Sequence, residues 1–151
     1  MVVFAKRILM AMIRFHQEGK YMKLVVFNVG SALCVYAEHQ TTRIVFDIGK
    51  GNNFSPVNDF LLPLYEKRGE HRLKNRNNRY GISQLIVSHP HKDHISDIQE
   101  FDKNFYAHLL TTPNSKSPNG NPQNINWRKI TTPDDPDVKY LKRMKIGRNL
   151  P

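Results

Sequence analysis

Cysteine is almost absent from this 151-residue sequence, whose only example is Cys34. A single cysteine excludes an intrachain disulfide and a cysteine-rich zinc site. It also fits a reducing compartment, so we expect a cytoplasmic protein. Cys34 lies within the apolar run of residues 32–37. We therefore interpret it as a small buried hydrophobic side chain rather than as a nucleophile.

Long hydrophobic runs are also missing. No stretch approaches the roughly 20 apolar residues that a membrane span needs, so we expect no membrane span. Near the N-terminus, the uncharged run of residues 8–13 is shorter than a signal-peptide core of roughly 7–15 residues, and no matching cleavage site follows. We interpret residues 1–22 as an N-terminal extension, either an amphipathic basic helix or an unstructured segment.

Acidic residues are few: 13 Asp and Glu stand against 23 Lys and Arg, which gives a net charge of +10. Such an excess suits a polyanionic partner, such as nucleic acid or another anionic substrate. The alternative is a well-solvated basic surface. Hydrophobic residues make up 39% and charged residues 24%, an ordinary globular balance that argues against full-length disorder. The length fits about one domain with a real core.

The first half of the chain predicts strands followed by a helix. Short apolar runs at residues 24–27, 32–37 and 44–46 are separated by turn signals and predict a small β-meander. Apolar residues then recur at helical spacing over residues 57–67, where Pro63 is expected to kink or shorten the helix.

The second half predicts an alternation of strands and helices. Residues 69–80 are polar and basic and predict a surface loop, and residues 82–87 predict a buried strand. A helix should follow with Asp93 as its N-cap, and then a strand over residues 105–110. Residues 112–151 are assigned to a loop-rich basic tail. This order indicates an α/β fold of sandwich type.

Four side chains that can bind metal fall within six residues: His89, His91, Asp93 and His94. Imidazole and carboxylate together suit zinc, and also manganese or iron. A buried strand ends at Ser88, so the scaffold should hold the ligands rigidly. Pro90 keeps His89 and His91 out of a helix, so both can point at one centre, while Asp93 and His94 can point at a second. The alternative is a chance polar loop in which Asp93 only caps a helix.

At these residues the sequence resembles the metallo-β-lactamase superfamily, whose signature H-x-H-x-D-H stands here as His89-Pro90-His91-Lys92-Asp93-His94. The preceding residues 85–88 look like the apolar strand that leads into this motif. Phe46-Asp47-Ile48-Gly49 resembles the strand-ending Asp-x-Gly of the family. Residues 24–31 are similar to the opening of the competence-protein (DNA-uptake) branch, although Asn28 replaces its acidic residue and Ala32 a small polar stretch.

The resemblance implies a site and a fold. His89 and His91 would bind a first metal ion, and Asp93 and His94 a second, with Asp93 also orienting the attacking water as the catalytic residue. Asp47 would support the metal loop from behind, or else serve only as a turn residue before Gly49. Residues 23–111 would form the N-terminal half of an αββα-sandwich domain, a mixed β-sheet with flanking helices. A completed site would hold two zinc ions, and two such ions would activate water at neutral pH.

The family completes this site with His, a bridging Asp and a final His from a second β-rich half. The only histidine after the motif, His108, comes too early and is interpreted as a half-buried strand residue. Asp134, Asp135 and Asp137 lie in a proline-broken loop that nothing marks as a ligand. We therefore expect a truncated or split hydrolase acting on an anionic substrate, such as a phosphodiester. A complementing C-terminal half or a homo-oligomer would be its partner. The alternative is a non-catalytic remnant that binds metal or nucleic acid.

Overall fold

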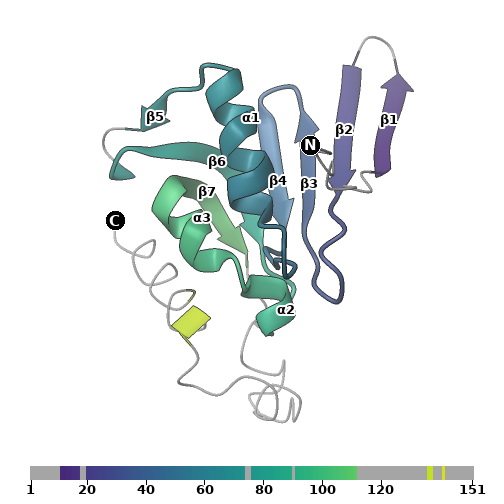
Figure 1. Ribbon diagram of the computed structural model, residues 1–151. Coiled ribbons are helices and arrows are strands. Elements are labelled where there is room, and N and C mark those ends of the chain that lie inside the picture. Colours follow the sequence, from purple (N-terminus) through teal and green to yellow (C-terminus); the bar gives the residue numbers. More distant parts are fainter. Residues whose placement is uncertain are drawn as a thin grey trace, which may run out of the picture.

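The computed structural model describes residues 11–17, 20–73, 76–89, 91–111, 136–137 and 141, with side chains from Met22 onward. These residues form a seven-stranded mixed sheet with helices packed against it, which confirms the α/β class (Figure 1). The tail expected over residues 112–151 lies outside the described residues, apart from positions 136, 137 and 141. None of the described helices is long and apolar enough to cross a bilayer.

The sheet begins with four antiparallel strands: β1 (Ala11–Gln17), β2 (Lys20–Val26), β3 (Val35–His39) and β4 (Thr42–Phe46). The meander expected from residues 24–46 is therefore confirmed, although β3 begins only at Val35. For residues 11–17, the expectation of a helix or an unstructured segment is wrong. From Ile13 to His16 apolar and polar residues alternate, which is the strand period of two, and Ile13 and Phe15 pair with Leu24 and Met22 of β2.

Two crossovers then build the parallel part of the sheet. From β4 the chain passes through a π-helical turn, η1 (Val57–Leu61), and α1 (Leu62–Lys67) to β6 (Arg79–Ile86), which pairs parallel with β4. It continues through α2 (Lys92–Ile95) and α3 (Ile98–Asn104) to β7 (Phe105–Thr111), which pairs parallel with β6. The segment expected to be only a loop also contains β5 (Arg72–Leu73), which pairs antiparallel with β6.

The helix expected over residues 57–67 is present as η1 followed directly by α1. The Leu62 N–H bonds the Val57 carbonyl, five residues back, just before Pro63. Proline has no N–H to donate, and its ring would collide with the carbonyl four residues back in an α-helix. We interpret the wide turn as the local solution, which lets the helical path continue through Pro63.

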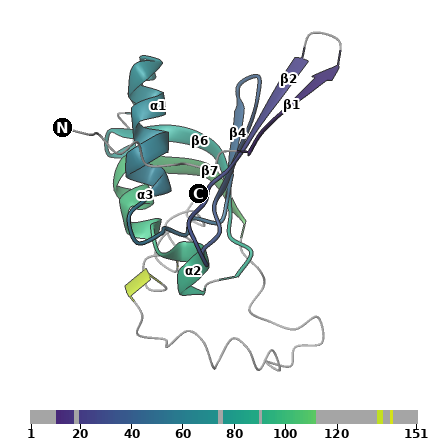
Figure 2. The same cartoon turned by 45° about the vertical axis from the view of Figure 1, so that its right-hand side comes forward.

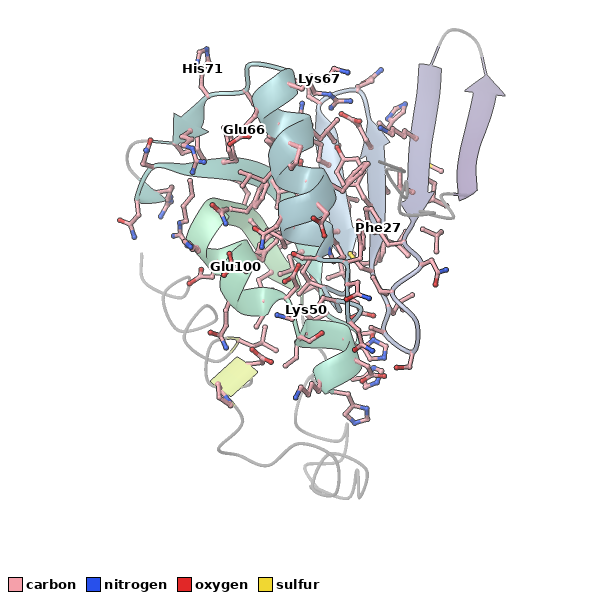
Figure 3. All side chains as sticks on the ribbon, in the orientation of Figure 1. Phe27, Lys50, Glu66, Lys67, His71 and Glu100 are labelled. Atoms are coloured by element: carbon pink, nitrogen blue, oxygen red, sulfur yellow. The ribbon has the colours of Figure 1, made fainter. Side chains whose placement is uncertain are left out.

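The core lies between the helices and one face of the sheet (Figure 2). Fully buried side chains from the strands, such as Tyr36 and Val45, meet Leu61, Tyr65 and Phe101 from the helices, and Figure 3 shows this layer filled with side chains. Cys34 belongs to this core, and burial raises its pKa well above the ordinary value, so its interpretation as a buried hydrophobic residue is confirmed.

Candidate metal centre

The motif residues lie at the carboxyl end of the parallel strands. β4 and β6 run side by side and end at Phe46 and Ile86, so the loops that follow both strands meet at one edge of the sheet. The Asp47 N–H donates to the Ile86 carbonyl at 2.7 Å, and the Val87 N–H donates to the Thr111 carbonyl of β7 at 2.8 Å. A rigid scaffold therefore carries the loop of residues 87–91.

The Asp-x-Gly segment after β4 has a backbone reason for its residue types. Asp47 adopts a positive φ of 53°, a left-handed conformation that Asp tolerates better than most residues. A Cβ on Gly49 would lie 1.9 Å from the carbonyl oxygen of Asp93, so only glycine allows α2 to approach this closely. The Ile48 N–H then donates to the His94 carbonyl at 2.7 Å. These contacts hold the segment that follows β4 against α2.

Asp47 contacts Ser88 and His94 through three hydrogen bonds. Its Oδ1 accepts from the backbone N–H of Ser88 at 2.7 Å, and its Oδ2 accepts from the Ser88 hydroxyl at 2.7 Å. The Nδ1 of His94 lies 2.8 Å from the same Oδ2. Asp47 is 2% exposed while Ser88 is exposed, so these bonds are partly shielded from water. Asp47 therefore makes more contacts than a plain turn residue would, and these contacts hold Ser88 and His94 beside each other.

These contacts indicate which imidazole nitrogens carry protons. The single hydroxyl proton of Ser88 goes to Asp47, so at the 2.9 Å contact between Ser88 Oγ and His89 Nδ1 the imidazole must be the donor. Because Asp47 is an acceptor, His94 also carries its proton on Nδ1. In a neutral ring this assignment leaves Nε2 with its lone pair, and a carboxylate on Nδ1–H is the usual support of a metal-binding histidine.

The cluster brings all four predicted ligands close together. The ring centroid of His89 lies 4.2 Å from that of His91 and 3.8 Å from that of His94, and the last two are 6.5 Å apart. The Asp93 carboxylate reaches 3.5 Å from His94 Nε2. Burial, followed by repulsion from His94 and His91, lowers the pKa of His89.

The donor types fit zinc, because neutral imidazole and carboxylate are its usual nitrogen and oxygen ligands. Within the described part of the chain, however, no group of three or more His, Cys, Asp or Glu side chains has the spacing to hold an ion. The rings would have to turn so that their Nε2 atoms face a common point.

One expectation at this site is wrong. Asp93 is not the N-cap of a helix: the cap of α2 is His91, whose extended backbone (φ −78°, ψ 152°) turns into the helix, and no side chain caps it. The helix expected around Ile95 to Phe101 is also broken into α2 and α3 at Ser96 and Asp97. The interpretation of Asp93 as only a helix cap is therefore excluded, and its carboxylate, 45% exposed, faces the cluster edge.

Sequence reasoning missed Ser88 as a functional residue. Among the described residues, Ser88 is the one side chain that contacts Asp47, His89 and His94 together. The only feature of the sequence that points to Ser88 is its position, as a small hydroxyl residue between a buried strand and the first histidine of the motif. His108 was placed correctly on a strand, but it is exposed rather than half-buried and belongs to the middle of β7.

Replacing Asp47 should loosen this loop measurably. Asp47→Ala leaves the Ser88 N–H without its acceptor and places alanine at a positive φ, so we expect a loss of about 2–3 kcal/mol in the free energy of unfolding. Asp47→Asn tolerates the backbone and keeps one acceptor, and should cost about 1 kcal/mol. Urea denaturation measures both. Asp59→Ala, which removes an exposed acceptor of the Ser55 N–H, is the control. Equal stability of Asp47→Ala and the control would contradict the bracing role.

A second buried carboxylate lies behind α2. Asp97 Oδ2 accepts from the Ser55 hydroxyl at 2.6 Å and from the Val57 N–H at 3.1 Å. Its Oδ1 has no hydrogen-bond partner among the described residues, and the nearest cation, Lys50 Nζ, is 4.0 Å away. Burial is the largest cause that raises the pKa of Asp97, and Glu100 adds to it, while Ser55, Val57 and Lys50 oppose it.

This raised pKa predicts how stability changes with pH. The folded chain holds the Asp97 proton more tightly than the unfolded chain, so its stability falls as pH rises from the ordinary value near 3.8 through the raised one. Asp97→Asn keeps the acceptor and removes the charge. We expect Asp97→Asn to gain in stability relative to wild type across that window, measured by urea denaturation at several pH values, with Glu66→Gln as an exposed control. A difference in unfolding free energy between Asp97→Asn and wild type that does not vary with pH would contradict this expectation.

Comparisons with protein-family models, with curated proteins and with solved structures find no match to this chain. Its relation to the metallo-β-lactamase superfamily therefore rests on the motif at residues 89–94 and stays a proposal.

Proposed function

We propose that this chain supplies metal ligands for a hydrolase centre of the metallo-β-lactamase type, one that acts on an anionic substrate. One observation supports this proposal most directly. Ser88 and Asp47 fix the Nδ1 protons of His89 and His94, which leaves both Nε2 atoms available for a metal ion. A chance polar loop has no need for a buried carboxylate that orients two imidazoles.

The roles of the residues follow from their positions. His89 and His91 would hold one ion, and His94 and Asp93 would hold a second, because Asp93 and His94 begin α2 while the other two precede it. Zinc is the ion that this donor set fits best, with manganese or iron as the alternatives. Bound ions of this kind activate water and polarise the bond to be cleaved. The half-exposed carboxylate of Asp93 would orient that water.

The surface charge favours an anionic substrate, such as a phosphodiester. Two arginine side chains lie flat on tyrosine rings at the end of the sheet opposite α2: Arg72 lies 4.3 Å from the Tyr80 ring centroid, and Arg76 4.4 Å from that of Tyr106. Among the described residues neither arginine has a carboxylate partner. Figure 3 shows Lys67 and His71 at the same end. Because this end lies away from the histidine cluster, the two arginines would contact only a polyanion that extends well beyond it, and the net charge of +10 is the more general support for an anionic substrate.

A metal- or nucleic-acid-binding role without turnover is the second candidate. It is favoured by the number of donors, because four side chains shared by two ions leave each ion with two protein ligands. Further donors would have to come from outside the described residues. A cytoplasmic location belongs to either proposal, since the single buried cysteine suits a reducing compartment.

Nitrogen NMR of the imidazoles tests the proposal directly, because it reports which ring nitrogen carries the proton. In the metal-free chain, His89 and His94 should show the tautomer with the proton on Nδ1, while exposed His39 and His71 should show the mixture typical of free imidazole. Adding zinc should shift the Nε2 signals of His89, His91 and His94 and leave those of His39 and His71 unchanged. Protons on Nε2 of His89 and His94, or zinc shifts spread over all histidines, would overturn it.

A further inference from the structure

Half of the net charge of the chain lies in residues 67–79. This segment contains six Lys or Arg and one Glu, a net charge of +5, while the whole chain carries +10. Figure 1 shows β5, which belongs to the segment, at the end of the sheet away from α2. Because β6 spans eight residues, roughly 25 Å separates this end from the histidine cluster. The positive charge is therefore concentrated at a place that the proposed metal centre does not use.

Two arginines at this end differ from the other arginines whose side chains the structure describes. Those others each pair with a carboxylate, and they are Arg43, Arg68 and Arg79. Among the described residues, no carboxylate lies within ion-pair distance of Arg72 or Arg76. Arg72 instead lies over the ring of Tyr80, and Arg76 over that of Tyr106. A ring contact uses none of the five N–H donors of a guanidinium, so donors remain for an anion from outside.

A tight turn holds these arginines in position. Asn77 and Asn78 adopt φ values of 55° and 58°, a left-handed conformation that Asn tolerates better than most residues. The Nη1 of Arg72 donates to the Asn78 carbonyl at 3.2 Å, and the Nε of Arg79 donates to the Arg76 carbonyl at 2.9 Å. Side chains that are already ordered lose less entropy when a ligand binds, so this arrangement favours binding.

Planar side chains accompany the charge. Tyr106 and His108 are two residues apart on β7, and their rings meet edge to face with centroids 5.5 Å apart. His108 is exposed, and so is Arg76, which lies 4.4 Å from the centroid of the Tyr106 ring. The bases of a single strand stack on histidine rings and on guanidinium planes. Arg76 and His108 therefore provide two exposed planar groups beside the same tyrosine.

We propose that Arg72, Arg76 and His108 form a binding surface for single-stranded nucleic acid. Phosphates would accept hydrogen bonds from the two guanidinium groups, and bases would stack on Arg76 and His108. The charge alone would suit any polyanion. The exposed planar groups favour a strand with unpaired bases, because the base faces of a duplex are covered by their neighbours in the stack. This binding does not depend on the proposed metal centre, since the surface contains none of its residues.

Fluorescence anisotropy of labelled oligo(dT) with the whole chain in EDTA tests the charged part of this surface. Arg72→Gln with Arg76→Gln should raise the Kd at least about tenfold. The slope of log affinity against log salt should become shallower by about 1.4, because each phosphate contact of a single strand contributes about 0.7. The charge-matched control is Lys50→Gln with Lys92→Gln near α2, where Figure 3 shows Lys50, and both values should stay close to wild type. Circular dichroism checks that every variant folds.

Two single variants test the stacking part. Arg76→Lys keeps the charge but loses the planar group, and His108→Ala removes an exposed ring, so each should raise the Kd about fivefold and leave the salt slope unchanged. Wild-type affinity in both would overturn the proposal, and so would equal Kd values for the double arginine variant and its lysine control. Inorganic polyphosphate that displaces the probe as well as unlabelled oligo(dT) does, or tighter binding of a matching duplex, would also overturn it, because charge alone would then explain the binding.

Discussion

Replacing His89 and His91 together by alanine should weaken zinc binding at least about a thousandfold. A structural zinc site is worth about 10–16 kcal/mol with four ligands, so each ligand contributes about 3 kcal/mol, and two together account for more than a factor of a thousand. The ring centroids of these histidines lie 4.2 Å apart at the end of β6, and both would serve the same ion. Competition with a chromogenic chelator measures the affinity.

The control for this experiment removes two histidines that lie away from the cluster. His39 ends β3 and His71 precedes β5, both are exposed, and Figure 3 shows His71 at the end opposite α2. The double variant His39→Ala with His71→Ala should bind zinc as wild type does. It has the same histidine count as the test variant, so it corrects for weak surface binding. Equal zinc content in the two double variants would show that the motif does not bind metal.

Single substitutions separate ligands from their support. His94→Ala removes a proposed ligand, while Ser88→Ala removes only the hydroxyl that orients His89. Loss of an orienting partner costs about 10–100-fold in metal affinity, which is less than loss of a ligand pair. Ser88→Ala should therefore fall between the control and the double variant. This expected order of zinc affinities follows from the contacts of Ser88 in the structure. The sequence alone assigns no role to Ser88.

Local patterns predicted most strands and the first helix correctly because these elements depend on short-range periodicity. The runs at 24–27, 44–46, 82–87 and 105–110 all lie in strands or at their ends, and the helix over 57–67 follows its apolar spacing. Residues 11–17 were misassigned because basic residues suggested an amphipathic helix. Their strand depends on pairing with β2, which local sequence does not encode.

At the candidate site, sequence predicted the ligand types but not how they are held. The strand that ends before His89 and the support from Asp47 could be expected from the motif. The position of Asp93 inside α2 could not, because it depends on the close approach of Gly49 to the Asp93 carbonyl.

Metal alone should not make the 151-residue chain an effective hydrolase. Two metal ions that activate water need enough protein ligands to hold both and still leave positions open for water and substrate. In the proposed assignment, His89 and His91 would give one ion two ligands, and Asp93 and His94 would give the other two. We expect turnover of phosphodiester, β-lactam and thioester substrates with zinc or manganese to stay near the uncatalysed rate.

Supplying the second half of a metallo-β-lactamase domain, fused or in trans, should raise zinc affinity and create activity together, because the added His and Asp ligands serve both purposes. Asp93→Ala in the completed protein should then abolish turnover, since it removes both a ligand and the group that orients water. The same half with the His89 and His91 double variant is the matched control and should stay inactive. Turnover by the 151-residue chain alone, abolished by Asp93→Ala, would contradict this prediction. Such turnover would mean that ligands outside the motif at residues 89–94 already complete the site. A content of two metal ions in that active chain, rather than one or none, would then identify a full two-metal centre.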